Sequence, residues 1–172
     1  MVVPAILGVG GLFGWAIKSR TEELRAAQER LAGERRKLYA ALLDPYVKVF
    51  ASTKDPALVK DAEKQLISVD YRRTALEVVL IGDDNVVDAY NVLMQHFFKQ
   101  GASAEDTFKP MRLYGVLLLA IRKSLGNAAT KLDEYDMLTH MITDIDDVLR
   151  EKGIQRTRAL RQQRHPRPQE HA

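Results

Sequence analysis

A histidine placed between two carboxylates is the first arrangement in this sequence that could support acid–base chemistry. Asp136, His140 and Asp144 follow one another at intervals of four residues, so on a helix their side chains would share one face. Flanking carboxylates can keep an imidazole protonated or hold one tautomer for proton transfer. A surface histidine in helical ion pairs would show the same spacing. Both interpretations stay open, and His140 is a candidate catalytic residue.

The other histidines and acidic residues give weaker indications of chemistry. His96 adjoins two phenylalanines, and we expect it to be a packing or surface residue rather than a ligand. The acidic run Asp144, Asp146 and Asp147 lacks the central glycine and the terminal glutamate of a calcium loop. The chain has no cysteine, which excludes disulfides, thiolate metal sites and cysteine nucleophiles. Because nucleotide-binding, zinc-protease and hydrolase motifs are also missing from the sequence, we expect no metal, no cofactor and no small-molecule substrate.

The segment IRKSLGN places an arginine and a polar residue at the corner between a helix and a loop. Arg122 falls in the last turn of an expected helix, and Asn127 follows Gly126. This spacing resembles the RxxxxH motif of the HEPN superfamily, whose arginine and histidine, from two protomers, cleave RNA without a metal. Asparagine replaces the histidine here and cannot exchange a proton near neutral pH. The resemblance implies a degenerate site with Arg122 and Asn127 as candidate catalytic residues, and His140 is a candidate through its own spacing. A structural role fits as well, with Arg122 paired to Asp133 and Asn127 in a left-handed turn.

Basic residues are concentrated at the carboxyl end of the chain. The 172 residues have a net charge of +3, but residues 151–172 hold six basic and two acidic residues, a net +4, which leaves −1 for residues 1–150. A basic tail is suited to phosphate groups of lipid or nucleic acid, and its composition is also that of a disordered, solvated end. The candidate phosphate or lipid contacts are Arg156, Arg158, Arg161 and Arg164.

The amino end has the composition of a membrane anchor. Sixteen residues from Val2 to Ile17 carry no charge, and Lys18 and Arg20 follow at once. This run is short, since a helix needs ~20 residues to cross the hydrocarbon core, so we expect snorkelling of Lys18 or local thinning. A buried core helix is the competing interpretation. The excess of basic residues over 18–37 predicts a single-pass protein of the bacterial inner membrane, with its N-terminus outside and its C-terminal domain in the cytoplasm.

Two spacings near the amino end favour contacts between copies of the chain. Gly10 and Gly14 form a GxxxG pair, which lets membrane helices approach closely, although glycine is common in such helices. Leu24, Leu31 and Leu38 lie seven residues apart, as in a coiled-coil seam. So short a seam cannot hold two helices together alone. We therefore expect a homo-oligomer formed through the anchor, the stalk and the following domain together.

Sequence patterns typical of helices continue along the chain as far as the acidic residues Asp144, Asp146 and Asp147. We expect a stalk helix over 20–44, bent or ended by Pro45, and further helices near 56–82, 83–101, 110–126 and 130–150, which gives an all-α bundle of about five helices. Helical spacing places the following residues toward the core: Leu58, Ala62, Leu66, Val69, Leu76, Leu80, Val86, Tyr90, Leu93, Phe97, Met111, Tyr114, Leu118, Ile121, Leu125, Tyr135, Leu138, Ile142, Ile145 and Leu149.

The expected organisation is a transmembrane anchor at 1–19, a cytoplasmic helical bundle at 20–150 and a basic tail at 151–172. With its degenerate motif, this architecture is similar to that of the small membrane accessory proteins of type VI-B CRISPR loci, which assemble into a ring-shaped pore and support antiviral defence. The resemblance implies a non-enzymatic, oligomeric permeability effector in antiphage defence, with an RNA-guided nuclease complex or nucleic acid as partner. Two alternatives stay open: a metal-independent ribonuclease that uses Arg122, with His140 as its candidate partner, and a membrane scaffold that tethers a partner through its basic tail.

Overall fold

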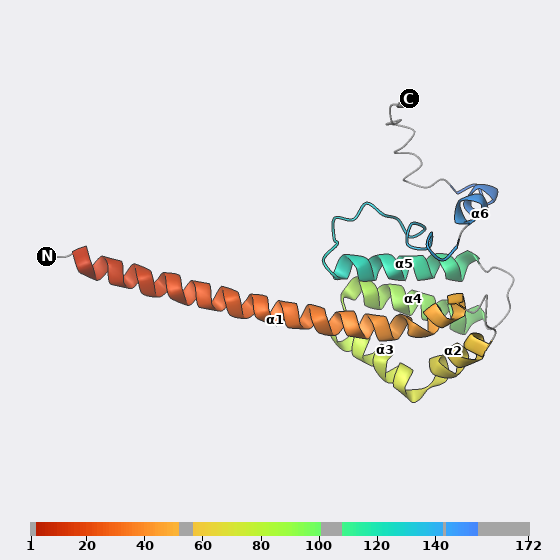
Figure 1. Cartoon of the computed structure of the whole chain (residues 1–172), viewed down its shortest axis with the longest axis horizontal. Helices are drawn as coiled ribbons and strands as arrows, with labels where there is room; N and C mark the ends of the chain where they lie inside the picture. Colours follow the sequence, from red (N-terminus) through yellow and green to blue (C-terminus); the bar gives the residue numbers. More distant parts are fainter. Residues whose placement is uncertain (1–2, 52–56, 101–107, 143, 155–172) are drawn as a thin grey trace, which may run out of the picture.

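The computed structural model describes residues 3–51, 57–100, 108–142 and 144–154, and describes side chains from residue 18 onward except at 19, 51 and 100. Within these ranges every regular element is an α-helix and no strand occurs, which confirms the all-α fold class. The helices follow one another along the chain as shown in Figure 1. Their bounds are α1 Val3–Ala51, α2 Ala57–Ile67, α3 Val69–Ile81, α4 Asp84–Gln100, α5 Phe108–Ser124 and α6 Ile145–Glu151.

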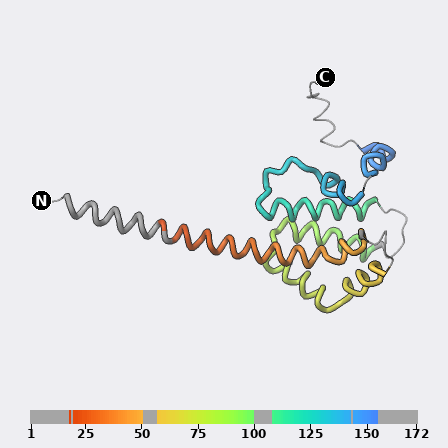
Figure 2. The backbone as a smooth tube through the Cα atoms, viewed as in Figure 1, coloured from red at the N-terminus to blue at the C-terminus, as the bar shows by residue number. Residues whose placement is uncertain are grey.

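Helix α1 is both a projecting arm and a core helix. Its 49 residues correspond to about 74 Å of helix. The part of α1 at residues 20–32 extends away from the other helices (Figures 1 and 2), and its side chains are exposed. Further along the same helix, Tyr39, Leu42 and Tyr46 are buried in the bundle. One continuous helix therefore forms the stalk and supplies part of the core.

The expected end of the stalk helix near Asp44 is wrong, because Pro45 lies inside α1 and the helix continues to Ala51. Proline has no N–H for the carbonyl one turn earlier, and it normally kinks or ends a helix. Here the proline ring is fully buried. The next residue, Tyr46, packs on Tyr114 with ring centroids 5.1 Å apart. Packing of this turn inside the bundle thus offsets the missing hydrogen bond.

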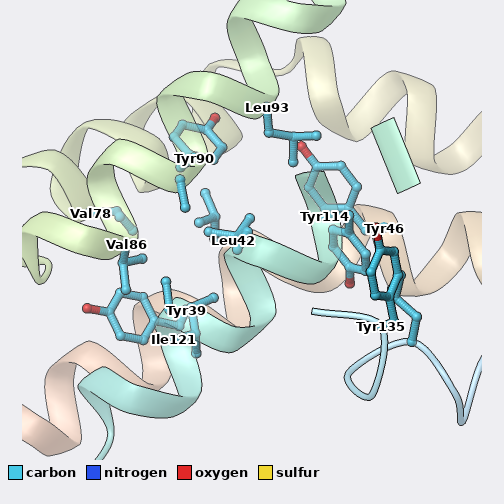
Figure 3. Close-up of a cluster of buried hydrophobic side chains, with 14 of the residues drawn as sticks. Tyr39, Leu42, Tyr46, Val78, Val86, Tyr90, Leu93, Tyr114, Ile121 and Tyr135 are labelled. Carbon is cyan, nitrogen blue, oxygen red and sulfur yellow. The ribbon is translucent and has the colours of Figure 1, made fainter. Parts of the chain in front are cut away.

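The bundle core is rich in tyrosine. All six tyrosines of the chain are buried. Figure 3 shows Tyr46, Tyr114 and Tyr135 gathered at one end of the cluster, and Tyr39 beside Ile121 at the other. Helices α4 and α5 pack on each other, and α1 packs on α2 and α3. The aromatic side chains therefore join the stalk helix to the rest of the bundle.

The segment expected to be one helix over 56–82 is two helices, α2 and α3, separated at Ser68. Ser68 has an extended backbone, and its Oγ accepts a hydrogen bond from the Tyr71 N–H at 3.1 Å, which is an N-cap. This break rotates α3 about its axis relative to the position it would have in one continuous helix. Tyr71 and Val78 are buried, whereas three residues expected in the core are exposed. These are Val69, Leu76 and Leu80, with exposed fractions of 72%, 58% and 72%.

Helices α4 and α5 agree closely with the expected segments 83–101 and 110–126. Val86, Tyr90 and Leu93 of α4 are buried as expected, and so are Tyr114 and Ile121 of α5. Phe97 departs from the expectation with 42% of its surface exposed. The agreement follows from clear end signals, since an acidic residue begins α4 and a positive-φ glycine follows α5.

The helix expected over 130–150 is wrong for most of its length. Turns occupy 134–141, and only α6 is helical. The cause is local, because Asp133 Oδ1 accepts hydrogen bonds from the N–H groups of Tyr135 and Asp136 at 3.1 and 2.8 Å. Such side-chain bonds to the backbone compete with a helix. Tyr135 and Leu138 are nevertheless buried, so the predicted core positions are right where the predicted helix is not.

Gly115 of α5 contacts the segment of turns at 134–141. A Cβ atom there would collide with the carbonyl oxygen of Glu134. We expect Gly115→Ala to lower the free energy of unfolding by about 2 kcal/mol, because the backbone must move. Gly33→Ala is the matched control, because nothing lies within 4 Å of a Cβ at that helical position and alanine favours helix by about 1 kcal/mol. Urea unfolding followed by circular dichroism measures both, and equal stability of the two variants would contradict the close contact.

The buried tyrosines predict a defined alkaline transition. Burial raises the pKa of Tyr46 and of Tyr114 to about 12, and it raises the pKa of Tyr71 and of Tyr90 as well. An unfolded tyrosine ionises near pH 10, so the stability from the neutral hydroxyls is complete below pH 10 and is lost as the pH rises toward 12. Ionisation of these four tyrosines, measured as tyrosinate absorbance, should therefore accompany the loss of helical circular dichroism. Ionisation near pH 10 with the helices intact would show that the hydroxyls are open to water.

Candidate functional site

The corner that follows α5 is held by backbone hydrogen bonds. Gly126 has a φ of 101°, a left-handed conformation that glycine adopts without strain. The Asn127 N–H donates to the Arg122 carbonyl at 3.3 Å, and the Thr130 N–H donates to the Asn127 carbonyl at 3.0 Å. No described residue other than glycine has a positive φ. The left-handed turn therefore belongs to Gly126, and its expected assignment to Asn127 is wrong.

Arg122 is engaged in holding this corner. It is half-buried, and its Nε donates to Thr130 Oγ1 at 3.2 Å. The same hydroxyl oxygen accepts a longer bond from the Leu132 N–H at 3.4 Å. Asn127 is exposed. The structure thus brings both residues of the degenerate motif to one corner, where the guanidinium ties the end of α5 to the following loop.

His140 does not lie between two carboxylates on a helix. It is exposed in the turns before α6, and within the described part of the chain it makes no hydrogen bond or ion pair. Asp136 Oδ2 accepts instead from the Asp133 N–H at 3.0 Å. The predicted helical face of Asp136, His140 and Asp144 is therefore wrong, because side-chain bonds to the backbone replace the helix that would have formed it.

His96 and the hollows of the bundle offer little chemistry. Of the two expected roles of His96, packing or surface, the structure shows packing: its side chain is buried and its ring centroid lies 6.0 Å from that of Phe97. Two hollows of about 560 and 710 Å³ adjoin Tyr46 and are lined mainly by apolar side chains. Among their described lining residues the only charged ones are Lys152 and Arg72. The tyrosines that line them, Tyr46, Tyr71, Tyr90 and Tyr114, have pKa values that burial raises, so their hydroxyls are poor proton donors near neutral pH.

The leucine seam of α1 is the clearest candidate interaction surface of the stalk. Leu24 is 65% exposed and Leu31 is 39% exposed, whereas Leu38 packs against the bundle core. Residues seven apart on a helix share one face. The face of α1 that is covered by the bundle therefore continues along the stalk, where no described element of the chain covers it.

Polar contacts fix the direction in which the stalk leaves the bundle. Arg35 donates from Nε to the Ile81 carbonyl at 2.7 Å and from Nη2 to the Gly82 carbonyl at 3.3 Å. These carbonyls end α3, where the helix dipole favours a cation. One turn further along, the Tyr39 hydroxyl accepts from the Asp83 N–H at 3.0 Å. Bending of the stalk at its base would break these bonds.

A second polar set joins α1 to α2. Lys48 Nζ lies 3.0 Å from Asp61 Oδ2 and 2.8 Å from Gln65 Oε1, and Gln65 Nε2 donates to Asp44 Oδ2 at 2.9 Å. The bond from Gln65 lowers the pKa of Asp44, and the bond to Asp61 raises the pKa of Lys48. Both ionised forms are thus favoured, but at this exposed surface such pairs are weak. Their role is to set the position of α2.

Several predicted site residues are not described. In the expected anchor at 1–19, the side chains at 1–17 and 19, including Gly10 and Gly14, lie outside the described residues, as do Arg156, Arg158, Arg161 and Arg164. Within the described part, no helix is long and apolar enough to cross a membrane. Comparison of the chain with known protein families, curated proteins and solved structures found no match.

The bond between Arg122 and Thr130 predicts coupled effects on stability. Arg122→Ala and Thr130→Val should each lower the free energy of unfolding by about 1 kcal/mol, and the double variant should lose less than the sum, with a coupling of about 0.5–1.5 kcal/mol. Lys123→Ala, at the exposed neighbouring cation, is the control and should have little effect.

Labelled RNA incubated with the same proteins should stay intact. Cleavage that Arg122→Ala abolishes, and that Thr130→Val leaves unchanged, would assign the arginine to catalysis and contradict its structural role.

Proposed function

We propose that this chain is a non-enzymatic, membrane-anchored protein whose copies associate through α1. The observation that carries the proposal is that α1 is one helix from Val3 to Ala51: it connects the apolar amino end, an exposed leucine seam and the bundle core. Anchoring by residues 1–19 places the N-terminus outside and the bundle in the cytoplasm, following the basic residues after the apolar run. Association in a membrane is favoured because anchoring concentrates the copies.

The geometry of the candidate catalytic residues supports a role other than catalysis. Arg122 donates to Thr130, and His140 is exposed in a different segment. No described contact joins the two residues. An asparagine at the histidine position of the motif cannot serve as a general base. A metal-independent ribonuclease therefore has less support than an interaction protein.

A role in membrane permeability during antiphage defence is the more specific form of the proposal. It rests on the similarity in architecture to the accessory proteins of type VI-B CRISPR loci. A seam with Leu24 and Leu31 exposed on stalks of fixed direction would suit a ring of copies around a membrane opening. The basic tail at 151–172 would contact phosphate, either in lipid headgroups or in the nucleic acid of a partner complex.

Reconstitution of the full chain into dye-loaded vesicles tests this proposal. The wild type should stay with the vesicles, cross-link into species larger than a monomer and release dye. Leu24→Asn combined with Leu31→Asn should stay bound to the vesicles but lose cross-linking and dye release, because the seam no longer buries apolar surface. Glu22→Asn combined with Glu29→Asn is the matched control, since these exposed residues lie on the other side of the same turns.

Each readout tests a separate part of the proposal. A wild type that does not bind vesicles would contradict the anchor. A monomer at every concentration would contradict association, and stable oligomers that release no dye would contradict the permeability role alone.

A further inference from the structure

The outer side of α3 carries an apolar stripe that the bundle leaves open. Val69, Leu76 and Leu80 are 72%, 58% and 72% exposed. At 100° per residue these three side chains fall within a narrow sector of the helix, on the side opposite the buried Tyr71 and Val78. Val79, 47% exposed, extends the patch on one flank. We call these four residues the α3 face.

Nothing in the described chain covers the α3 face. Helix α3 contacts α1 and α2 only through its inner side, and Figure 1 shows α2 and α3 at the outer edge of the bundle. Apolar patches of this kind on a helical surface mark sites of protein association. A partner for the α3 face must match both its apolar stripe and the charged residues beside it.

The charges beside the stripe fit a second copy of the same chain. Arg73 and Glu77 lie on one flank of the stripe, four residues apart, and both are exposed. Among the described residues, Arg73 makes only an exposed contact of 3.7 Å to Asp70, which is weak. An arginine that precedes a glutamate by four residues is the less favourable order for pairing within a helix. Both side chains are therefore available to another molecule.

A twofold axis through the level of residue 75 pairs these charges between two copies. In such an antiparallel arrangement the flank of one α3 faces the same flank of the other, so Arg73 of each copy lies opposite Glu77 of its neighbour. Leu76 then meets the second Leu76 near the axis, and Val69 lies beside the neighbour's Leu80. A parallel arrangement would place Arg72 and Arg73 of the two copies together, which is repulsive.

We infer that the α3 face is an antiparallel contact between two copies of this chain, centred on Leu76 and held in register by reciprocal Arg73–Glu77 ion pairs. One pair of helices buries less than the ~800 Å² per partner of a standard interface. The contact is therefore weak alone and is populated only at high protein concentration. Because the twofold axis reverses α3, the contact is distinct from a parallel pairing of stalks through Leu24 and Leu31.

Disulfide trapping of the full chain in mild detergent tests this inference, since the chain has no cysteine of its own. Leu76→Cys should cross-link with itself. Val69→Cys alone should not, because the two copies of residue 69 would lie about 18 Å apart along the helices. A mixture of Val69→Cys and Leu80→Cys proteins should form the mixed dimer. Asp88→Cys, at an exposed position on α4, sets the level of random cross-linking.

Charge reversal provides an independent check. In the Leu76→Cys background, Arg73→Glu or Glu77→Arg should each lower cross-linking on the order of fivefold, because both ion pairs become like-charge pairs. Mixing the two variants, or combining both changes in one chain, should restore it. Circular dichroism confirms that the exposed substitutions leave the fold intact.

The outcomes separate this contact from the proposed function. Cross-linking of Leu76→Cys that persists with Leu24→Asn and Leu31→Asn supports an α3 contact whatever the stalks do. Self-linking of Val69→Cys as efficient as that of Leu76→Cys would overturn the antiparallel arrangement. Leu76→Cys linking no better than Asp88→Cys would overturn the contact as a whole, and would leave stalk association unaffected.

Discussion

Burial of one face of α1 is the constraint on which the rest of this structure depends. Tyr39, Leu42 and Tyr46 are buried, and the other helices pack around them. The Tyr39 hydroxyl accepts from the Asp83 N–H and lies 3.2 Å from Ser124 Oγ, so it joins α1 to the turn before α4 and to the end of α5. The stalk and the bundle are consequently connected rigidly, so a change in the direction of the stalk would disturb the packing of the core.

The sequence was sufficient to predict the elements whose limits are set by local chemistry, and insufficient where tertiary contacts decide. Helices α4 and α5 have clear end signals and one apolar face each, and both were placed within a few residues. Around Asp133 the apolar spacing of a helix is present, but the carboxylate bonds to the backbone at 3.1 and 2.8 Å instead. Burial of Tyr135 requires only contact with the core, so the spacing predicted the burial without predicting the helix.

At the candidate site, too, local spacing was predictable from the sequence and tertiary contacts were not. A spacing of five residues across the end of a helix was enough to bring Arg122 and Asn127 to one corner. The bond from Arg122 to Thr130 was not predictable, because it depends on the loop that replaces the expected helix. The outward stripe of α3 was missed for a related reason. A single serine cap at Ser68 ends α2 and resets the rotation of α3, so residues that would continue the apolar face of one long helix turn to the surface.

The distribution of aromatic and aliphatic residues links these surfaces to function. Every tyrosine is inside, where a hydroxyl such as that of Tyr71, bonded to the Leu42 carbonyl at 3.3 Å, fixes one helix relative to another. By contrast, Leu24 and Leu31 of α1 are exposed, and so are Val69, Leu76 and Leu80 of α3. Exposed aliphatic side chains stabilise nothing in a monomer, but each contributes about 1.5–3 kcal/mol when fully covered. A rigid core with exposed aliphatic stripes is the arrangement expected of a subunit. The core holds the stripes in position, and the stripes are buried only when a neighbouring molecule covers them.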